Sequence, residues 1–104
     1  MSAMRVATLS DLWAGESLGL VVKGTKVLLV NVDGEVRAYE DRCAHLGGEL
    51  SKGKLEGRVL TCWAHEWQYD AATGEGIRPR GVGLRQFCAR VEGDDILVDV
   101  DDGG

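Results

Sequence analysis

Proline and cysteine are scarce in this chain of 104 residues, and it has no long apolar run. A single proline stands against 15 glycines, a balance that favours the tight turns of a fold built from short strands. The apolar run from Val27 to Val30 is far too short to cross a membrane, and no signal peptide is visible. We therefore expect a cytoplasmic protein without a membrane partner.

Positive charge is also in short supply, because 12 lysines and arginines stand against 17 acidic residues and leave a net charge of −5. Nucleic-acid binding requires a basic patch to neutralise phosphates, so nucleic acid is not the expected partner. An acidic chain is suited either to solubility alone or to docking on a positively charged protein surface. The length fits one domain, residues 1–104.

Alternating apolar residues separated by glycine turns predict an all-β fold, a small sandwich or barrel. Asp33-Gly34 lies between the apolar segments 26–32 and 36–40, a pattern typical of a two-residue hairpin. Further strands are expected at residues 5–8, 18–22, 59–61, 66–70, 84–91 and 96–100.

One helical turn is expected near the N-terminus, with Ser10 or Asp11 as its cap and Trp13 in the core. No segment keeps the 3.6-residue apolar period over three turns, so no longer helix is expected.

Both histidines and two of the three cysteines occur in two mixed pairs, Cys43-Ala44-His45 and Cys62-Trp63-Ala64-His65. Zinc sites with two cysteines and two histidines usually keep like ligands together. A Rieske-type [2Fe–2S] cluster instead binds one iron through two thiolates and the other through two imidazoles. Each loop must then present one cysteine and one histidine. The spacing therefore favours one such cluster at Cys43, His45, Cys62 and His65 over zinc.

The chain resembles the Rieske family over its whole length, most specifically from Asp41 to about Pro79. It is most similar to the Rieske ferredoxin component of toluene-type multicomponent di-iron monooxygenases. The segments that carry this resemblance are residues 11–16, 62–67, 73–79 and 93–96. The resemblance implies an antiparallel β-sandwich as a basal part and a smaller inserted cluster-binding lobe, roughly residues 42–83.

The resemblance also implies a function, that of a one-electron carrier without catalytic residues of its own. An NADH-dependent flavin reductase would supply the electron. A di-iron hydroxylase acting on aromatic or alkene substrates would receive it, and the carrier would be a monomer. Two alternatives remain open: a ferredoxin serving a Rieske aromatic-ring dioxygenase, and the Rieske-like small subunit of a nitrite reductase.

Three departures from the high-potential Rieske proteins follow from the same resemblance. Those proteins have a second cysteine in each loop, forming a disulfide, where this chain has Gly48 and Ala64. They also have a serine that donates a hydrogen bond to a sulfide, where this chain has Trp67. Fewer hydrogen bonds to sulfur destabilise the reduced cluster, so we expect a midpoint potential of about −150 to 0 mV.

Two structural roles are open for Tyr69 and two for Pro79. Tyr69 stands where high-potential members have a tyrosine that donates to a cysteine sulfur, or it is a strand aromatic that packs on the lobe. Pro79 belongs either to a third loop that shields the cluster or to a plain turn. Trp67 is expected to pack against the lobe, and Cys88 to be a structural or incidental thiol.

Overall fold

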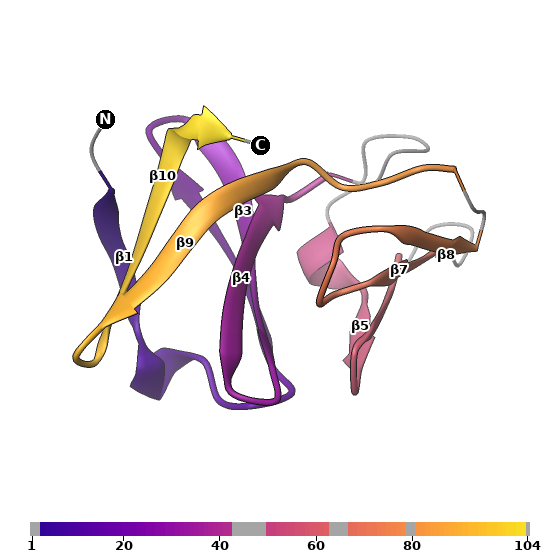
Figure 1. The fold of residues 1–104 in the computed structure, drawn as a ribbon, viewed down its shortest axis with the longest axis horizontal. Coiled ribbons are helices and arrows are strands. Elements are labelled where there is room, and N and C mark those ends of the chain that lie inside the picture. The colour runs from indigo at the N-terminus through magenta and orange to yellow at the C-terminus, as the bar shows by residue number, and fades with distance from the viewer. Residues whose placement is uncertain (1–2, 43–49, 63–66, 79–80, 104) are drawn as a thin grey trace.

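Two antiparallel sheets form the part of the chain that the computed structural model describes, residues 3–42, 50–62, 67–78 and 81–103. The larger sheet has six strands in the order β1-β10-β9-β4-β3-β2, and the smaller has four in the order β5-β6-β7-β8. We call the six-stranded part the base and the four-stranded part the lobe. Figure 1 shows the base on the left and the lobe on the right. The prediction of an all-β fold with a basal part and a smaller inserted lobe is confirmed.

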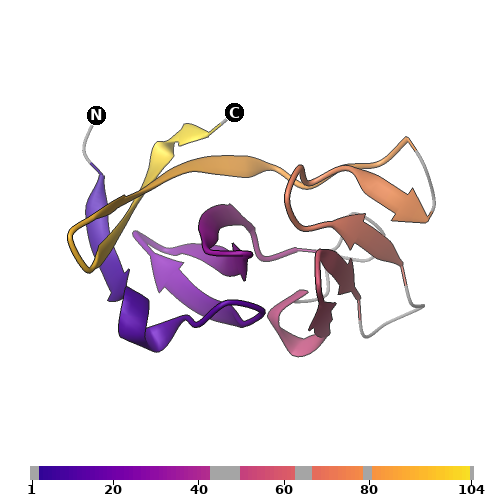
Figure 2. The ribbon, with the colours of Figure 1, turned by 60° about the horizontal axis from the view of Figure 1, so that its bottom comes forward.

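The lobe is inserted between the fourth and ninth strands of the chain. The elements are β1 Met4–Thr8, η1 Leu9–Asp11, β2 Ser17–Val22, β3 Thr25–Val32, β4 Glu35–Glu40, η2 Leu50–Lys52, β5 Lys54–Glu56, β6 Val59–Thr61, β7 Gln68–Asp70, β8 Gly76–Arg78, β9 Gln86–Glu92 and β10 Asp95–Gly103. Strands β5 and β8 were not expected from the sequence, because each has a single apolar residue, Leu55 or Ile77, which is too little to show an alternating pattern. Both ends of the chain belong to the base, because β1 and β10 are strands of its sheet (Figures 1 and 2).

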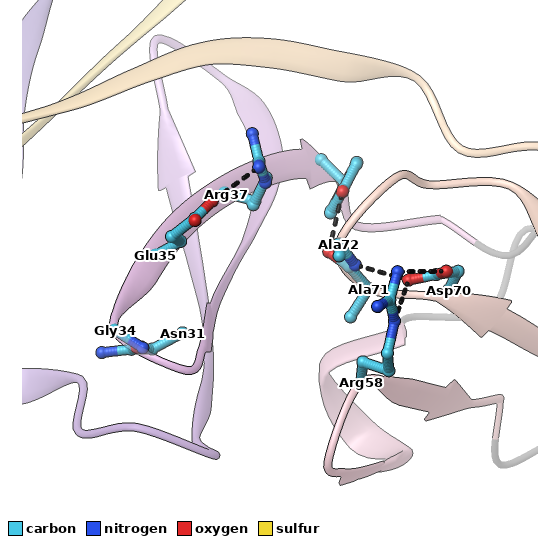
Figure 3. A network of polar contacts seen from close by, with 9 residues as sticks. Asn31, Gly34, Glu35, Arg37, Arg58, Asp70, Ala71 and Ala72 are labelled. Carbon is cyan, nitrogen blue, oxygen red and sulfur yellow. Dashed lines mark hydrogen bonds and ion pairs between the residues drawn. The ribbon is translucent and has the colours of Figure 1, made fainter.

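The predicted hairpin at Asp33-Gly34 is confirmed between β3 and β4. Both residues have positive φ, 54° and 91°, as the two-residue turn that matches strand twist requires. The Asn31 side chain supports this turn, because its Oδ1 accepts a hydrogen bond from the Gly34 amide at 2.8 Å (Figure 3). Its Nδ2 donates to the Leu12 carbonyl oxygen at 3.0 Å and so ties the turn to the N-terminal segment.

Strand β3 is buried on both faces, so it belongs to two cores. On one face, Val27 and Leu29 pack in the base cluster with β9 and β10. On the other face, Leu28 and Val30 pack in the lobe cluster. The base cluster consists of Leu12, Val22, Val27, Leu29, Ala38, Phe87, Ile96, Val98 and Val100. The lobe cluster consists of Leu28, Val30, Val32, Tyr39, Leu50, Leu60, Cys62, Tyr69 and Ala71.

Tyr39 of β4 joins the base to the lobe by a polar contact as well. Its side chain is fully buried, and its hydroxyl donates to the Ala71 carbonyl oxygen, beyond β7, at 2.8 Å. Gly74 approaches the ring so closely that a Cβ there would lie 2.8 Å from Tyr39 Cε1. Burial raises the pKa of Tyr39 to about 12, although the nearby positive charge of Arg37 acts in the opposite direction.

The expectation that Trp13 lies in the core is wrong, because its side chain is 68% exposed. Its neighbour Leu12 is buried instead, at 1% exposure. The helical turn itself is confirmed as η1, but its cap is Thr8 rather than Ser10 or Asp11. The Asp11 carboxylate accepts hydrogen bonds from the amide and the hydroxyl of Thr8, at 3.1 and 3.0 Å. Among the described residues, no helix is long and apolar enough to cross a membrane.

Replacing Tyr39 with phenylalanine should lower the free energy of unfolding by about 1–3 kcal/mol, because the buried Ala71 carbonyl loses its donor. The substitution should also change how the free energy of unfolding depends on pH. A folded-state pKa of about 12, above the ordinary 10.0, makes wild-type stability fall as the pH rises between those values. That loss, up to about 2.7 kcal/mol, should be absent from Tyr39→Phe.

Urea unfolding of both proteins at pH 8 and at several points between pH 10 and 12 measures both effects. Parallel stability curves for the two proteins above pH 10 would contradict the assignment of the pH effect to Tyr39.

Candidate metal centre

Cys62 is the one proposed ligand among the described residues, and it lies directly after β6 with 1% of its surface exposed. Its amide donates to the Trp67 carbonyl oxygen at 2.7 Å, which brings together the two ends of the segment that contains the second motif. Cys43, His45 and His65 lie outside the described residues, as do Gly48, Ala64 and Pro79. The ligand set as a whole therefore remains a prediction.

The chain that leaves the first motif lies against the chain that enters the second. Leu50, the first described residue after Cys43-Ala44-His45, is fully buried in the lobe cluster together with Cys62. Gly53 packs so tightly that a Cβ there would collide with the carbonyl oxygen of Thr61, the residue before Cys62. Its amide donates to the Leu50 carbonyl oxygen at 2.9 Å. This arrangement places the segment that follows the first motif beside the segment that precedes the second, as two loops that share one cluster require.

The first motif is also bracketed by a polar pair, a buried aspartate and a half-buried serine, that the sequence did not predict. Asp41, with 3% of its surface exposed, lies on one side of the motif, and Ser51 lies on the other. One carboxylate oxygen of Asp41 accepts from the Ser51 amide at 2.8 Å, and the other accepts from the Ser51 hydroxyl at 2.6 Å. A lone aspartate beside a motif resembles any surface charge, so only the three-dimensional structure reveals its burial.

Aromatic residues complete the lobe around Cys62. Tyr69 of β7 is fully buried in the lobe cluster and pairs with Leu60 of β6. Trp67 is partly buried and packs against the same cluster, so the expected packing role is confirmed. Cys88 lies exposed on β9 in the base, outside both clusters.

An ion pair holds the far end of the lobe sheet. Arg58, in the turn between β5 and β6, donates to both carboxylate oxygens of Asp70 at the end of β7, at 3.2 and 2.8 Å (Figure 3). The Ala72 amide donates to the same carboxylate at 2.9 Å. The hydrogen bonds from Arg58 are the main reason that the pKa of Asp70 lies below its ordinary value. This contact is exposed, so we expect it to fix geometry more than to add stability.

The donors present fit an iron–sulfur cluster. A cysteine thiolate at position 62 would lie in apolar surroundings, which suit a polarisable, largely uncharged cluster. Within the ranges that the structure describes, no three histidine, cysteine or acidic residues converge into a metal site. No competing site is therefore found in those ranges.

Gly53→Ala should destabilise the lobe by about 1–3 kcal/mol, because the added methyl has no space beside the Thr61 carbonyl. Gly83→Ala is the matched control, since a Cβ there would make only an ordinary contact at 3.5 Å with the Gly74 carbonyl oxygen. Thermal unfolding of the two variants checks this difference. Equal melting temperatures for the two variants would contradict the close approach at Gly53.

Sequence comparison finds relatives along almost the whole chain. The ferredoxin component of the alkene monooxygenase system of Xanthobacter autotrophicus is 42% identical over 94 residues, covering 89% of this chain and 77% of that relative. The ferredoxin component of biphenyl 2,3-dioxygenase from Rhodococcus jostii is 36% identical over 104 residues, covering 99% of this chain and 97% of that protein.

Structure comparison gives the same result. The ferredoxin of carbazole 1,9a-dioxygenase from Nocardioides aromaticivorans superposes with a TM-score of 0.85 and 29% identity, over 94% of this chain and 97% of that one. The sequence profile of the Rieske [2Fe–2S] domain matches residues 2–87. The two mixed Cys/His pairs, the inserted lobe and these matches agree, and the chain belongs to the Rieske [2Fe–2S] domain family, whose cofactor is a [2Fe–2S] cluster.

Proposed function

We propose that this protein is a ferredoxin that carries single electrons between a reductase and an oxygenase. Cys43 and Cys62 would hold one iron of the cluster, and His45 and His65 the other. The observation that carries this assignment is the burial of Cys62 beside Leu50 in the hydrophobic core of the lobe. Cys62 precedes the rest of the second motif there, and Leu50 follows the first motif. The domain would span residues 1–104, with the cluster-binding lobe at roughly 42–83.

The chain's own residues supply a rigid, water-poor setting for this chemistry. When bound, the cluster accepts one electron and changes from a net charge of zero to −1 with its four ligands. The side chains of Cys62 and Tyr69 lie inside the hydrophobic core of the lobe, where solvent does not reach them. Each histidine would bind through one ring nitrogen and keep the other protonated for contact with a partner.

The partners follow from the relatives rather than from the lobe itself. The alkene monooxygenase component shares more identity with this chain than the biphenyl dioxygenase component does, 42% against 36%. That difference favours a monooxygenase hydroxylase, which would be a di-iron enzyme, as the acceptor. We further propose an NADH-dependent flavin reductase as the donor and a monomeric carrier, as the resemblance implies. The second candidate is a ferredoxin of an aromatic-ring dioxygenase, which the second relative matches over 97% of its length.

The choice between the two candidates is tested by reconstitution. Purified cluster-loaded protein and an NADH-dependent reductase are mixed either with an alkene monooxygenase hydroxylase or with a biphenyl dioxygenase oxygenase. Faster product formation with the hydroxylase supports the proposal. Faster turnover with the dioxygenase supports the second candidate, and failure to accept an electron from dithionite would overturn both.

Cys62→Ser should abolish the cluster, because the serine hydroxyl is a far weaker ligand for iron than a thiolate. Cys88→Ser should keep it, since Cys88 lies exposed on β9. The cluster content of both variants is measured by iron and sulfide analysis, by visible colour and by the rhombic EPR signal of the reduced protein. A colourless wild-type protein with stoichiometric zinc would overturn the assignment, as would a Cys62→Ser protein that retains the full signal.

Tyr69→Phe should make the midpoint potential more negative, by about 60 mV for the loss of one hydrogen-bonding dipole worth ~1.4 kcal/mol. Tyr69 is fully buried in the same hydrophobic core as Cys62. The low dielectric of this core strengthens the effect of a hydroxyl dipole on the charge of the reduced iron–sulfur cluster. Phenylalanine keeps the ring packing. Protein-film voltammetry of both proteins gives the difference, and an unchanged midpoint would leave Tyr69 with a packing role alone.

A further inference from the structure

We propose that Asp41 and Ser51 form a clasp that positions the first ligand loop, an inference that rests on the proposed ligand set. Asp41 follows β4 and stands two residues before Cys43, whereas Ser51 lies in η2 beyond the same motif. The two residues therefore join the ends of the segment that carries Cys43 and His45, one proposed ligand for each iron. Neither residue is a ligand, so their role is to position the loop.

The chemistry of the contact suits a permanent closure. Both carboxylate oxygens of Asp41 are used, one by the Ser51 amide at 2.8 Å and one by the Ser51 hydroxyl at 2.6 Å. A hydroxyl-to-carboxylate contact of that length is a charge-assisted hydrogen bond, stronger than a neutral one. With 3% of its surface exposed, Asp41 has little water to replace these donors. Opening the clasp would leave a buried charge without donors, which is strongly unfavourable.

The base holds the clasp from two sides. The Asp41 amide donates to the Lys26 carbonyl oxygen of β3 at 3.0 Å. Gly19 of the edge strand β2 covers it, since a Cβ there would lie 2.5 Å from Ser51 Oγ and 3.1 Å from Asp41 Oδ2. Only glycine leaves this space, so strand β2 closes over the clasp without displacing it.

The clasp explains how the first loop is held without a disulfide. The high-potential members of the family brace their loops with a pair of cysteines, which this chain replaces with Gly48 and Ala64. Fixing both ends of a loop removes much of its conformational freedom, whether the tie is covalent or hydrogen-bonded. Asp41 and Ser51 thus keep Cys43 and His45 in register with the second loop, and cluster retention depends on them.

The test compares variants of the clasp with matched variants at the other end of the molecule. Ser51→Ala removes the hydroxyl contact and keeps the amide contact, and Asp41→Ala removes both. Asp41→Asn removes the charge but keeps an acceptor for the amide and gains a donor for the hydroxyl. Thr8→Ala is the control, because Thr8 also donates its amide and hydroxyl to an aspartate, Asp11, but does so in an exposed position at the end of β1 in the base.

Two measurements on the cluster-loaded proteins separate positioning from general stability. The first is the rate at which visible absorbance is lost in excess iron chelator. The second is the shape of the rhombic EPR signal of the reduced protein, which a change in ligand geometry broadens or shifts. We expect cluster loss at least fivefold faster in Ser51→Ala and tenfold faster in Asp41→Ala, with an altered signal. Asp41→Asn, which keeps partners for both Ser51 groups but loses the charge assistance, should lie between wild type and Asp41→Ala. Thr8→Ala should lose the cluster at most twofold faster than wild type.

Gly19→Ala provides a second variant that leaves both partners of the clasp intact, and it should release the cluster faster than wild type as well. The proposal is overturned if Ser51→Ala and Gly19→Ala lose the cluster no faster than Thr8→Ala. It is also overturned if Asp41→Asn loses the cluster as fast as Asp41→Ala, since the two hydrogen bonds to Ser51 would then contribute nothing to cluster retention. A wild-type protein that binds no iron would instead overturn the proposed function.

Discussion

The burial of β3 on both faces is the constraint on which the rest of the structure depends. A strand with one solvent-exposed face usually alternates polar and apolar residues. Strand β3 has no such face in its middle, because four successive residues are fully buried, namely Val27, Leu28, Leu29 and Val30. The base covers one face and the lobe covers the other. The lobe is therefore not a separate unit on a linker, because its core continues into the middle of the base sheet. Any shift of this strand would move the cluster-binding segments with it.

The features of the fold that could be predicted from sequence are those with a local physical signature. Asp33-Gly34 adopts the positive φ values that its hairpin requires, and Ile96 and Val98 are fully buried as expected, with the less buried Leu97 between them. Trp13 and Leu12 show why other features could not be predicted. Which of two adjacent apolar residues faces the core depends on the path of the backbone. That path is set by Asn31, which binds the Leu12 carbonyl, and by the Glu16 carboxylate, which accepts from the Trp13 amide at 2.9 Å.

The proposed ligands could be predicted from the sequence, whereas the residues that support them could not. Two mixed pairs of cysteine and histidine can be read directly, because the chemistry of the cluster demands those residue types at short spacing. Asp41, Gly53 and Tyr39 have no such pattern around them. Their roles depend on burial and on approach to residues distant in sequence, such as Thr61 beside Gly53 and Ala71 beside Tyr39. Only the folded chain provides that information.

Three ties between base and lobe reach three different parts of the lobe. The apolar face of β3 enters its core, the Tyr39 hydroxyl reaches the segment after β7, and Asp41 holds η2. A single tie would act as a hinge and two would leave an axis of rotation, whereas three at separate points fix one body against another. An electron carrier benefits from this arrangement, because a cluster whose ligands cannot shift on reduction exchanges electrons with little reorganisation. The polar ties in this small lobe thus add to rigidity as well as to stability.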